Sequence, residues 1–191
     1  MKRIADIILS LTFILLSLPL CIIICCAIKL DDSGKIFYLS QRIGLRGRRF
    51  NMFKFRTMNC NNTDFSEEQL VEYQKNFKLK NDDRITTVGR WLRRHSLDEI
   101  PQLLNVLKGN MSIIGPRPKL PGEIDLYENS KNELLSVLPG MTGYWQVYRK
   151  NADSDEIMRN MDLYYIRNRT TAMDLKILLL SFLTLISRKN Y

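Results

Sequence analysis

The chain has 191 residues, of which 45% are apolar, so its length suits one domain with an ample core and room for a membrane segment. Its 29 Lys and Arg residues outnumber its 20 Asp and Glu residues, and this balance favours a polyanionic partner such as nucleic acid, anionic lipid or a phosphorylated substrate. A disulfide framework and a zinc site are both disfavoured, because most of the four cysteines lie inside one apolar run and the chain has a single histidine.

The first predicted element is an uncharged apolar run over residues 7–28. As one helix it would be about 33 Å long, enough to cross a bilayer core of about 30 Å. Lys2 and Arg3 precede the run, as basic residues precede the apolar part of a signal peptide. However, no small-residue cleavage site follows the run, so a signal peptide fits poorly. The residues leave two interpretations open: a plain transmembrane helix that tolerates Pro19, and a re-entrant helix that breaks at Pro19 and returns to the same face. Basic residues flank the run on both sides, which favours the re-entrant path under the positive-inside rule.

Residues 36–57 predict a β-hairpin. Aromatic and branched residues dominate residues 36–40 and 50–57, and the segment that joins them has two glycines for turns. Between Arg42 and Arg56 every charged residue is basic. This turn is therefore either a solvated surface or a patch that faces anionic lipid headgroups.

Further segments complete the predicted fold. The polar stretch 59–83 is expected to be a surface excursion with a short helix over 66–78, and residues 88–94 form a basic amphipathic turn. Near the C-terminus we expect a helix over 155–167 and a last helix over 174–186, whose apolar run is too short to span a membrane. That run suits either an interfacial helix or an ordinary buried helix.

The strongest chemical signal is a pair of adjacent carboxylates, Asp98 and Glu99, upstream of a Gly-Pro-Arg-Pro corner at residues 115–118. Ser96 and Glu99 match a capping box, but Pro101 fits a helix better if the helix begins later. Either way the pair lies at a helix start, where free N–H groups also bind phosphate. The two prolines of the corner hold its arginine in a fixed direction. Carboxylates with arginines, and without a cysteine or histidine cluster, indicate phosphate chemistry with a hard metal such as Mg²⁺.

At these residues the chain resembles the small monotopic phosphoglycosyl transferases, the bacterial sugar transferases that begin polyprenyl-linked glycan assembly. The resemblance covers nearly the whole chain, and the number of ordered motifs argues against chance. The motifs are, in chain order, Lys2-Arg3-x-x-Asp6, residues 41–44, 53–58, 96–118 and 138–143, Gln146-Val147, and residues 174–176. We expect a short, single-domain form of the family.

The resemblance implies an α+β fold that is mostly α-helical. Residues 1–30 would form a re-entrant membrane helix broken at Pro19. Residues 31–191 would form a membrane-associated catalytic domain on the cytoplasmic face of the bacterial inner (plasma) membrane. A small β-hairpin and amphipathic interfacial helices would surround the active site. The resemblance thereby selects the re-entrant path from the two that the residues leave open.

The resemblance also implies a two-step transfer of a phosphosugar from a UDP-sugar to polyprenyl (undecaprenyl) phosphate. Asp98 would attack the β-phosphate, release UMP and form a covalent aspartyl-phosphosugar intermediate, which polyprenyl phosphate would then attack. Glu99 would hold Mg²⁺, the expected cofactor. The reaction would be the first membrane step of capsule, O-antigen, exopolysaccharide or glycoprotein glycan synthesis, with membrane lipid and downstream glycosyltransferases as further partners.

The candidate substrate-binding residues are mainly cations. Arg117, held between Pro116 and Pro118, is the best candidate for a phosphate clamp. The further candidates are Lys54, Arg56, Arg90, Arg94 and Gln146.

Departures from the family pattern bear on these expectations. Leu18 stands where the family has a serine before Pro19, and Asn110 stands where it has an acid. Residues 148–150 replace a common Asn-Gly-Arg sequence, which affects the expected contacts to the sugar or nucleotide.

A different class of function is a non-catalytic basic membrane adaptor that binds anionic lipid. It explains the charge and the apolar run, but not the carboxylate pair or the Pro-Arg-Pro corner. Nucleic-acid binding is disfavoured by the membrane segment and by the lack of a recognised motif in the sequence.

Overall fold

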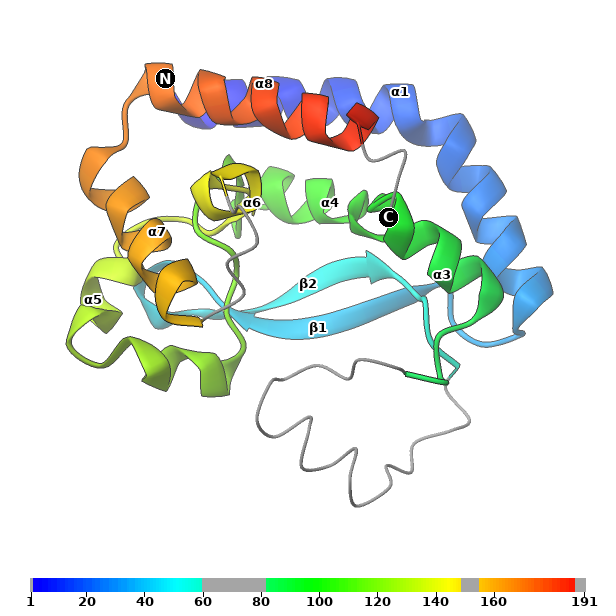
Figure 1. The fold of residues 1–191 in the computed structure, drawn as a ribbon. Helices are drawn as coiled ribbons and strands as arrows, with labels where there is room; N and C mark the ends of the chain where they lie inside the picture. The colour runs from blue at the N-terminus through cyan, green and yellow to red at the C-terminus, as the bar shows by residue number, and fades with distance from the viewer. Residues whose placement is uncertain (1, 60–81, 149–154, 188–191) are drawn as a thin grey trace.

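The structure, a computed structural model, describes residues 2–59, 82–148 and 155–187 (Figure 1). Most of these residues are helical, and their strands form two small two-stranded sheets, which confirms the expected mostly helical α+β class. The helices are α1 (Lys2–Asp31), α3 (Thr87–Arg94), α4 (Gln102–Leu107), α5 (Lys131–Leu134), α6 (Tyr144–Tyr148), α7 (Asp155–Asn168) and α8 (Thr171–Ser187). The strands are β1 (Phe37–Ile43), β2 (Arg49–Phe55), β3 (Ser112–Ile114) and β4 (Gly140–Thr142), and the 3₁₀ turns are η1 (Leu45–Gly47), η2 (Leu97–Glu99) and η3 (Pro121–Ser130).

α1 has the polarity of a helix surrounded by lipid. Its buried residues include Asp6 and Ser10, whereas Leu15 and Leu16 are 70% and 73% exposed. It is long and apolar enough to cross a membrane, and little of its apolar stretch is buried by the rest of the protein. A water-soluble helix buries its apolar face instead. The apolar N-terminal helix expected from the sequence is therefore present.

The expected break at Pro19 is not confirmed as an interruption of the helix. α1 continues through Pro19 as one helix, and Figure 1 shows it bending part-way along its length. A proline removes one backbone N–H donor and crowds the preceding turn, which kinks a helix when its neighbours hold both halves. The second half packs through Ile24 and Ile28 onto β2 and α3, and the first half contacts α4 and β3.

β1 and β2 form the antiparallel hairpin expected over residues 36–57, with Phe37 opposite Phe55. The turn between them passes through Arg46 and Gly47, whose φ angles are 55° and 75°, and glycine adopts this conformation without a steric penalty. Figure 1 shows the hairpin below α4, on the side away from α8. The hairpin and the two apolar helices α1 and α8 therefore enclose α4 between them.

A second sheet of two short parallel strands, which the sequence did not predict, fixes the corner at residues 115–118. Ser112 of β3 pairs with Gly140 of β4, and Gly115 donates a backbone hydrogen bond to Thr142 at 2.9 Å. The two backbones lie so close that a Cβ atom on Gly140 would collide with the Gly115 nitrogen. Only glycine fits at position 140.

The C-terminal helices expected over 155–167 and 174–186 are confirmed as α7 and α8. α8 begins about one turn earlier than expected, so Asp174 lies in its first turn. The basic stretch 88–94 is confirmed as part of α3. The helix expected over 66–78 lies outside the described residues.

The two ends of the polar excursion meet at a neck, defined here as residues 58–59 with 84–85. Met58 and Ile85 form an isolated antiparallel bridge, and Asn59 donates a backbone hydrogen bond to Arg84 at 2.7 Å. The chain therefore leaves β2 and returns to α3 at nearly the same point.

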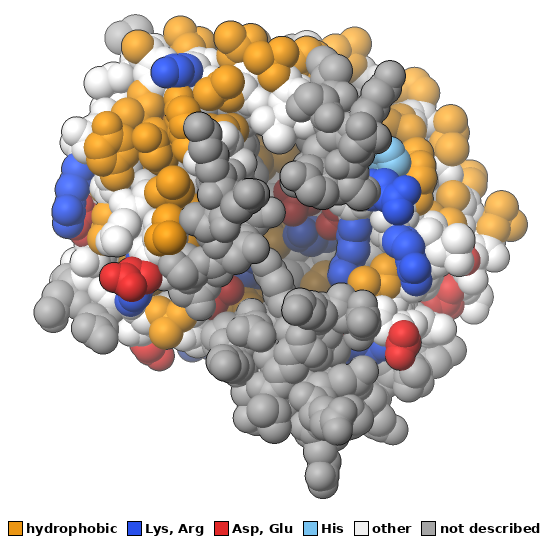
Figure 2. All heavy atoms as spheres, in the orientation of Figure 1, with side chains coloured by type: hydrophobic (Ala, Val, Ile, Leu, Met, Phe, Trp, Pro, Cys, Tyr) orange, Lys and Arg blue, Asp and Glu red, His pale blue; other side chains and the backbone are white. Residues whose placement is uncertain are grey.

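α8 shares the polarity of α1. Ile177 is fully buried, whereas Leu175 and Leu179 are 63% and 60% exposed. Figure 1 draws α8 in front of the first half of α1, and Lys2 at the start of α1 pairs with Asp174 in the first turn of α8. Figure 2 shows hydrophobic side chains gathered over that edge of the molecule. Each of the two helices therefore exposes apolar side chains.

The first turns of α1 are bonded to the segments that surround the carboxylate pair. The Arg3 guanidinium donates one hydrogen bond to Val106 O at 2.5 Å and another to Leu107 O at 2.9 Å. These carbonyls lie at the end of α4, where helix carbonyls lack intrahelical partners. Asp6, only 5% exposed, accepts hydrogen bonds from Ser112 Oγ and Ile113 N at 3.1 and 3.0 Å. The start of α1 thus contacts both α4 and β3.

Asn105 ties α4 to the hairpin. Its side chain is fully buried; Oδ1 accepts from Phe53 N at 2.9 Å and Nδ2 donates to Asn51 O at 2.8 Å. These bonds satisfy two backbone groups of β2 that face α4, so α4 and β2 cannot move independently.

We expect Asn105→Ala to lower the free energy of unfolding by about 2–4 kcal/mol, because two backbone groups would lose their partners beneath α4. Chemical denaturation of the detergent-solubilised protein, followed by tryptophan fluorescence, measures this change. Leu104→Ala is the matched control in the same helix: Leu104 is 41% exposed, and we expect a change below about 1 kcal/mol. Equal losses in the two variants would contradict the role given to Asn105.

Candidate active site

The two carboxylates lie on η2, one turn of 3₁₀ helix directly before α4. Ser96, just before this turn, has left-handed backbone angles (φ 55°, ψ 22°) and makes no capping bond, a conformation that costs a non-glycine residue about 1–2 kcal/mol. The capping box, one of the two helix starts that the sequence leaves open, therefore does not form. Glu99 is bonded to Lys54 instead, and α4 begins only after Pro101.

Lys54 of β2 reaches both carboxylates. Its Nζ lies 3.3 Å from Asp98 Oδ2 and 2.8 Å from Glu99 Oε1. Asp98 is 7% exposed, whereas the Glu99 side chain is 41% exposed. Burial raises the pKa of Asp98 above its ordinary value; the Lys54 ammonium opposes this shift and the Glu99 carboxylate adds to it. The charge of Asp98 therefore depends strongly on Lys54.

A cavity of about 590 Å³ opens beside the pair. Its charged lining residues are Arg42, Lys54, Glu99 and Arg117, and Gln146 also lines it. Figure 2 shows a hollow in this face of the molecule with acidic and basic side chains together inside it. The volume lies within the range of about 300–1,000 Å³ that is usual for small-molecule sites.

The hairpin places two of these cations on one face. Opposite residues of paired strands point to the same side of a sheet, and Ser40 lies opposite Met52 while Tyr38 lies opposite Lys54. Arg42, two residues after Ser40 on the same strand, therefore shares the face that carries Lys54. Strand alternation thus supplies two positive charges to one wall of the cavity.

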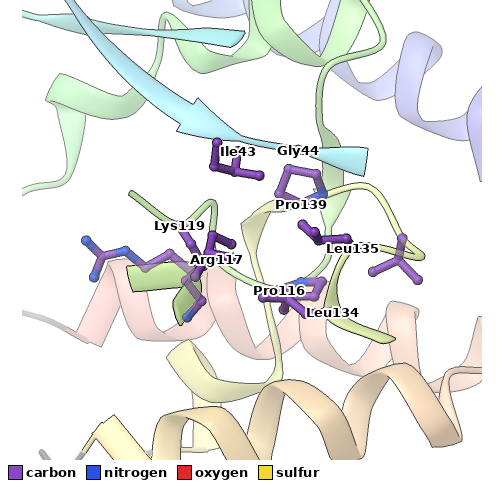
Figure 3. A pocket seen from close by; sticks show the side chains of 10 residues that line it. Ile43, Gly44, Pro116, Arg117, Lys119, Leu134, Leu135 and Pro139 are labelled. Carbon is purple, nitrogen blue, oxygen red and sulfur yellow. The ribbon is translucent and has the colours of Figure 1, made fainter. Parts of the chain in front are cut away.

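The Gly-Pro-Arg-Pro corner reaches the cavity through Arg117 and Pro118. Its backbone is bonded on both sides: Gly140 N donates to Pro116 O at 2.8 Å, and Arg42 Nη1 donates to Pro118 O at 3.3 Å. Figure 3 shows the Arg117 side chain extending away from the apolar side chains of a small pocket at the corner. The rigidity expected from the two prolines is therefore reinforced by hydrogen bonds, and Arg117 lines both the small pocket and the larger cavity.

The structure does not bring every predicted cation to this cavity. Arg56 is 5% exposed, pairs with the Asp32 carboxylate and donates to Asp32 O at 2.7 Å. Arg90 and Arg94 lie on the exposed surface of α3 and do not line the cavity. Lys54, Arg117, Pro118 and Gln146 line the cavity together with Glu99, whereas Asp98 is outside the lining and is linked to it through Lys54. Pro116 lines the small pocket at the corner instead. A substrate-binding role for the other three arginines stays a prediction.

Two residues that line the cavity, Arg42 and His95, were not predicted. The Arg42 side chain is 11% exposed and its Nε donates to Ser40 Oγ at 3.2 Å. The predicted strand ends at residue 40, whereas β1 continues to Ile43, so Arg42 falls on the same face as Ser40. His95 Nδ1 lies 2.9 Å from Trp91 O, and nothing in the sequence beyond its position before the carboxylate block indicates its place on the cavity.

The residues fit a magnesium ion that arrives with a phosphorylated substrate. Within residues 2–59, 82–148 and 155–187, no group of three or more His, Cys, Asp or Glu side chains could hold a metal by itself. Mg²⁺, however, is usually bound through one or two carboxylates, with substrate phosphates and water as the other ligands. Glu99 is partly exposed and lines the cavity, so its carboxylate suits that role.

Comparison with known proteins gives a match along almost the whole chain. The family model described as bacterial sugar transferase matches residues 1–188. The undecaprenyl-phosphate galactose phosphotransferase of Salmonella typhimurium is 40% identical over 185 residues, which cover 93% of this chain and 39% of that protein. The exopolysaccharide production protein ExoY of Rhizobium meliloti is 38% identical over 183 residues, covering 92% of this chain and 81% of that protein.

A third relative is the undecaprenyl-phosphate glucose phosphotransferase of Komagataeibacter xylinus. It is 35% identical over 201 residues, which cover 99% of this chain and 36% of that protein. The chain spans about two fifths of the length of the two phosphotransferases named here.

We expect Lys54→Met to raise the pKa of Asp98 further, because it removes the nearest cation that opposes the effect of burial. Titration of protein labelled with ¹³C at the aspartate carboxyl carbons, without divalent cations, measures this shift. Asp82 is the internal control, because Arg84 lowers the pKa of Asp82 and Lys54 takes no part in that shift. An Asp98 midpoint that does not move would contradict the electrostatic role of Lys54.

The same change has a defined effect on stability. The pKa of Asp98 is higher in the folded state than in the unfolded state, so folding favours its protonated form. The stability that this provides is fully present below the unfolded-state pKa. It is lost as the pH rises through the folded-state pKa. Lys54→Met should enlarge that loss. Denaturation curves of both proteins across this pH range measure it.

Proposed function

The chain belongs to the bacterial sugar transferase family, and from this we propose that it transfers a phosphosugar from a UDP-sugar to undecaprenyl phosphate and releases UMP. Its relatives include undecaprenyl-phosphate galactose and glucose phosphotransferases. The observation that carries the proposal is the cavity beside Asp98 and Glu99, where Lys54 bonds both carboxylates and Arg117 lies on the same lining. This arrangement supplies a nucleophile and cations for a diphosphate.

In the proposed first step, a carboxylate oxygen of Asp98 attacks the β-phosphorus of the UDP-sugar. The bond from that phosphorus to the bridging oxygen breaks, so UMP leaves and the sugar phosphate stays on Asp98 as an acyl phosphate. In the second step, an oxygen of the lipid phosphate attacks the same phosphorus and restores the Asp98 carboxylate. The raised pKa of Asp98 supports this role, because a more basic carboxylate is a better nucleophile once ionised and Lys54 favours the ionised form.

Other residues would offset the negative charge of the diphosphate. Lys54 and Arg117 are the cavity cations best placed for it, with Pro116 and Pro118 holding Arg117 and Gln146 contributing polar contacts. Glu99 would hold Mg²⁺, which supplies further charge compensation when bound.

We propose further that α1 is a re-entrant helix and that the protein is monotopic on the cytoplasmic face of the bacterial inner membrane. At the start of α1, Lys2 Nζ lies 2.7 Å from Asp174 of α8. Just after its end, Asp32 pairs with Arg56 next to β2. A helix of this length measures about 45 Å, so a helix that crossed the bilayer would place one of these anchors on the far side. Both anchors belong to the same folded body, which supports a helix that enters and leaves by one face.

In this proposal residues 1–30 are the membrane helix and residues 31–191 the catalytic domain. The lipid-linked sugar would be the first intermediate of a capsule, O-antigen, exopolysaccharide or glycoprotein glycan, and downstream glycosyltransferases would consume it. One relative is named for exopolysaccharide production. A basic membrane adaptor, the competing class of function, gives no reason for Asp98 to be buried beside Lys54.

We expect Asp98→Asn to lower the rate of UMP release by about 10³-fold or more, because it removes the nucleophile. The assay combines detergent-purified protein, Mg²⁺, undecaprenyl phosphate and a panel of UDP-sugars. Asp125→Asn is the matched control, because the Asp125 side chain is 81% exposed and lies outside the cavity. Full turnover by Asp98→Asn would overturn the nucleophile assignment, and membrane binding without turnover by the wild type would favour the adaptor.

We expect both ends of α1 to be reached only from the cytoplasm. The measurement uses a membrane-impermeant thiol reagent, with one cysteine in an N-terminal tag and another replacing Ser33, in a protein without its native cysteines. Neither cysteine should react in intact spheroplasts, and both should react after permeabilisation. Labelling of the tag alone in intact spheroplasts would indicate a spanning helix.

A further inference from the structure

A buried ion pair lies directly after the corner, and the proposed reaction does not use it. Lys119 Nζ lies 2.9 Å from Asp162 Oδ2, and the two side chains are only 5% and 2% exposed. Tyr127 donates its hydroxyl to the same carboxylate oxygen at 3.0 Å. Burial and the neighbouring Asp162 charge raise the pKa of Tyr127, so its hydroxyl stays protonated and remains a donor.

Stability alone gives little reason for such a pair. The cost of removing two charges from water about offsets their attraction, and apolar residues of similar volume often replace a buried pair without loss of stability. A charged hydrogen bond does add geometric specificity, because it holds two particular atoms at a short distance. The place of Lys119 in the chain indicates which parts of the molecule this bond holds.

The backbone of Lys119 joins the corner to the end of β1. Lys119 follows Pro118 directly, and its carbonyl accepts a hydrogen bond from Ile43 N at 3.0 Å. Figure 3 shows Ile43, Arg117 and Lys119 around the same small pocket. Arg117 lies two residues before Lys119, and Arg42 lies one residue before Ile43. A shift of Lys119 would therefore move both arginines that line the larger cavity.

The segment around Lys119 also holds the Arg42 side chain. Arg42 Nη1 donates to Pro118 O at 3.3 Å and lies 3.9 Å from Glu123 Oε2. The same Glu123 oxygen accepts a hydrogen bond from Leu120 N at 2.8 Å. Residues 118–123 therefore set the place of Arg42 as well as that of the corner.

α7 gives the pair a fixed support. Asp162 lies on α7, and Tyr165, one turn later, is 2% exposed. Tyr165 donates to Asp174 Oδ1 of α8 at 2.7 Å, and its oxygen accepts from Lys2 Nζ at 3.0 Å. α7 is thus tied to the first turns of both apolar helices, and the bond from Lys119 to Asp162 attaches the corner to it.

We propose that Lys119 and Asp162 are positioning residues whose ion pair sets the separation of Arg42 and Arg117, so that both guanidinium groups contact the diphosphate of the UDP-sugar. The inference rests on the proposed function and adds to it two positioning residues and a second phosphate-binding arginine. Two guanidinium groups at fixed positions suit a diphosphate, which carries its charge on two neighbouring phosphate groups. A displacement of about 1 Å in such an arrangement costs up to about 10²-fold in rate.

The first test removes both charges and nearly keeps the shape. Lys119→Met/Asp162→Asn has side chains of similar volume, and the asparagine still offers Tyr127 an acceptor. We expect a melting temperature within about 4 °C of the wild type, but a fall in kcat/KM for the UDP-sugar of about tenfold or more. The dissociation constant of UDP, measured by calorimetry on the detergent-purified protein, should rise with it.

The matched control is a second ion pair on α7. Arg167 Nε lies 2.7 Å from Glu133 Oε1 of α5, the two side chains are 60% and 31% exposed, and neither residue lines the cavity. Exposed pairs contribute little to stability. We therefore expect Arg167→Met/Glu133→Gln to keep the melting temperature, the kcat/KM and the UDP affinity of the wild type.

The outcomes separate a positioning role from a structural one. A Lys119→Met/Asp162→Asn protein with wild-type kcat/KM and UDP affinity would overturn the positioning role. A protein with this double change that does not fold would overturn it too, because the pair would then serve stability alone. A wild-type protein that binds no UDP and releases no UMP from any UDP-sugar would overturn the proposed function itself.

The second test leaves the ion pair intact and addresses Arg42. We expect Arg42→Gln and Arg117→Gln each to weaken UDP binding about tenfold and to leave uridine binding unchanged, because uridine lacks the phosphates; NMR titration measures both ligands. Arg49→Gln should change neither affinity, because Arg49 is exposed at the start of β2 and does not line the cavity. Wild-type affinity for UDP in Arg42→Gln, or an equal loss for UDP and uridine, would overturn the proposal.

Discussion

The attachment of the first two turns of α1 to the rest of the fold is the constraint on which the site depends. Arg3 bonds the carbonyls of residues 106–107 at the end of α4, and Asp6 holds Ser112 and Ile113 at the start of β3. α4 follows the carboxylate pair, and β3 leads into the corner that carries Arg117. One stretch of the apolar helix α1 therefore sets the separation between the two arms of the candidate site.

The inverted polarity of α1 follows from that attachment. A helix whose outer surface lies in lipid gains nothing by burying leucine, so its inner face can carry the polar groups that hold the domain. Asp6 is buried with hydrogen-bond donors on β3, which is the arrangement that a buried carboxylate requires. At the other end of the site Lys54 meets the same requirement for Asp98. Each buried acid in this region is thus matched by a specific donor from a different segment of the chain.

Local patterns in the sequence predicted much of this fold. Alternation and aromatic content located the hairpin, and apolar spacing located α7 and α8. The family resemblance, and not a local pattern, pointed to Lys54 and Gln146, which line the cavity. The two prolines around Arg117 indicated a rigid corner through their fixed backbone angles. These features depend on residues that are close together in the chain, where periodicity and turn chemistry carry the information.

The features that the sequence did not predict all depend on contacts between residues that are distant in the chain. The capping box at Ser96 failed because the backbone there is left-handed and Glu99 bonds to Lys54 on another strand. The pairing of Arg56 with Asp32, just after α1, was not predicted either, and the substrate-binding role of Arg56 stays a prediction. The parallel pairing of β3 with β4 depends on close glycine contacts between segments that carry no strand pattern of their own. A single sequence holds no direct signal for such pairings.

The neck between β2 and α3 has a practical consequence for work on this protein. Met58 pairs with Ile85, and Asn59 with Arg84, so the two sides of the neck are bonded to each other directly. Doubling the length of a loop closed in this way costs only about 0.6 kcal/mol. Because Lys2 is bonded into the fold, a tag at the N-terminus adjoins a structural contact. A fluorescent domain inserted between the two halves of the neck offers an alternative attachment point that leaves β2 and α3 where they are.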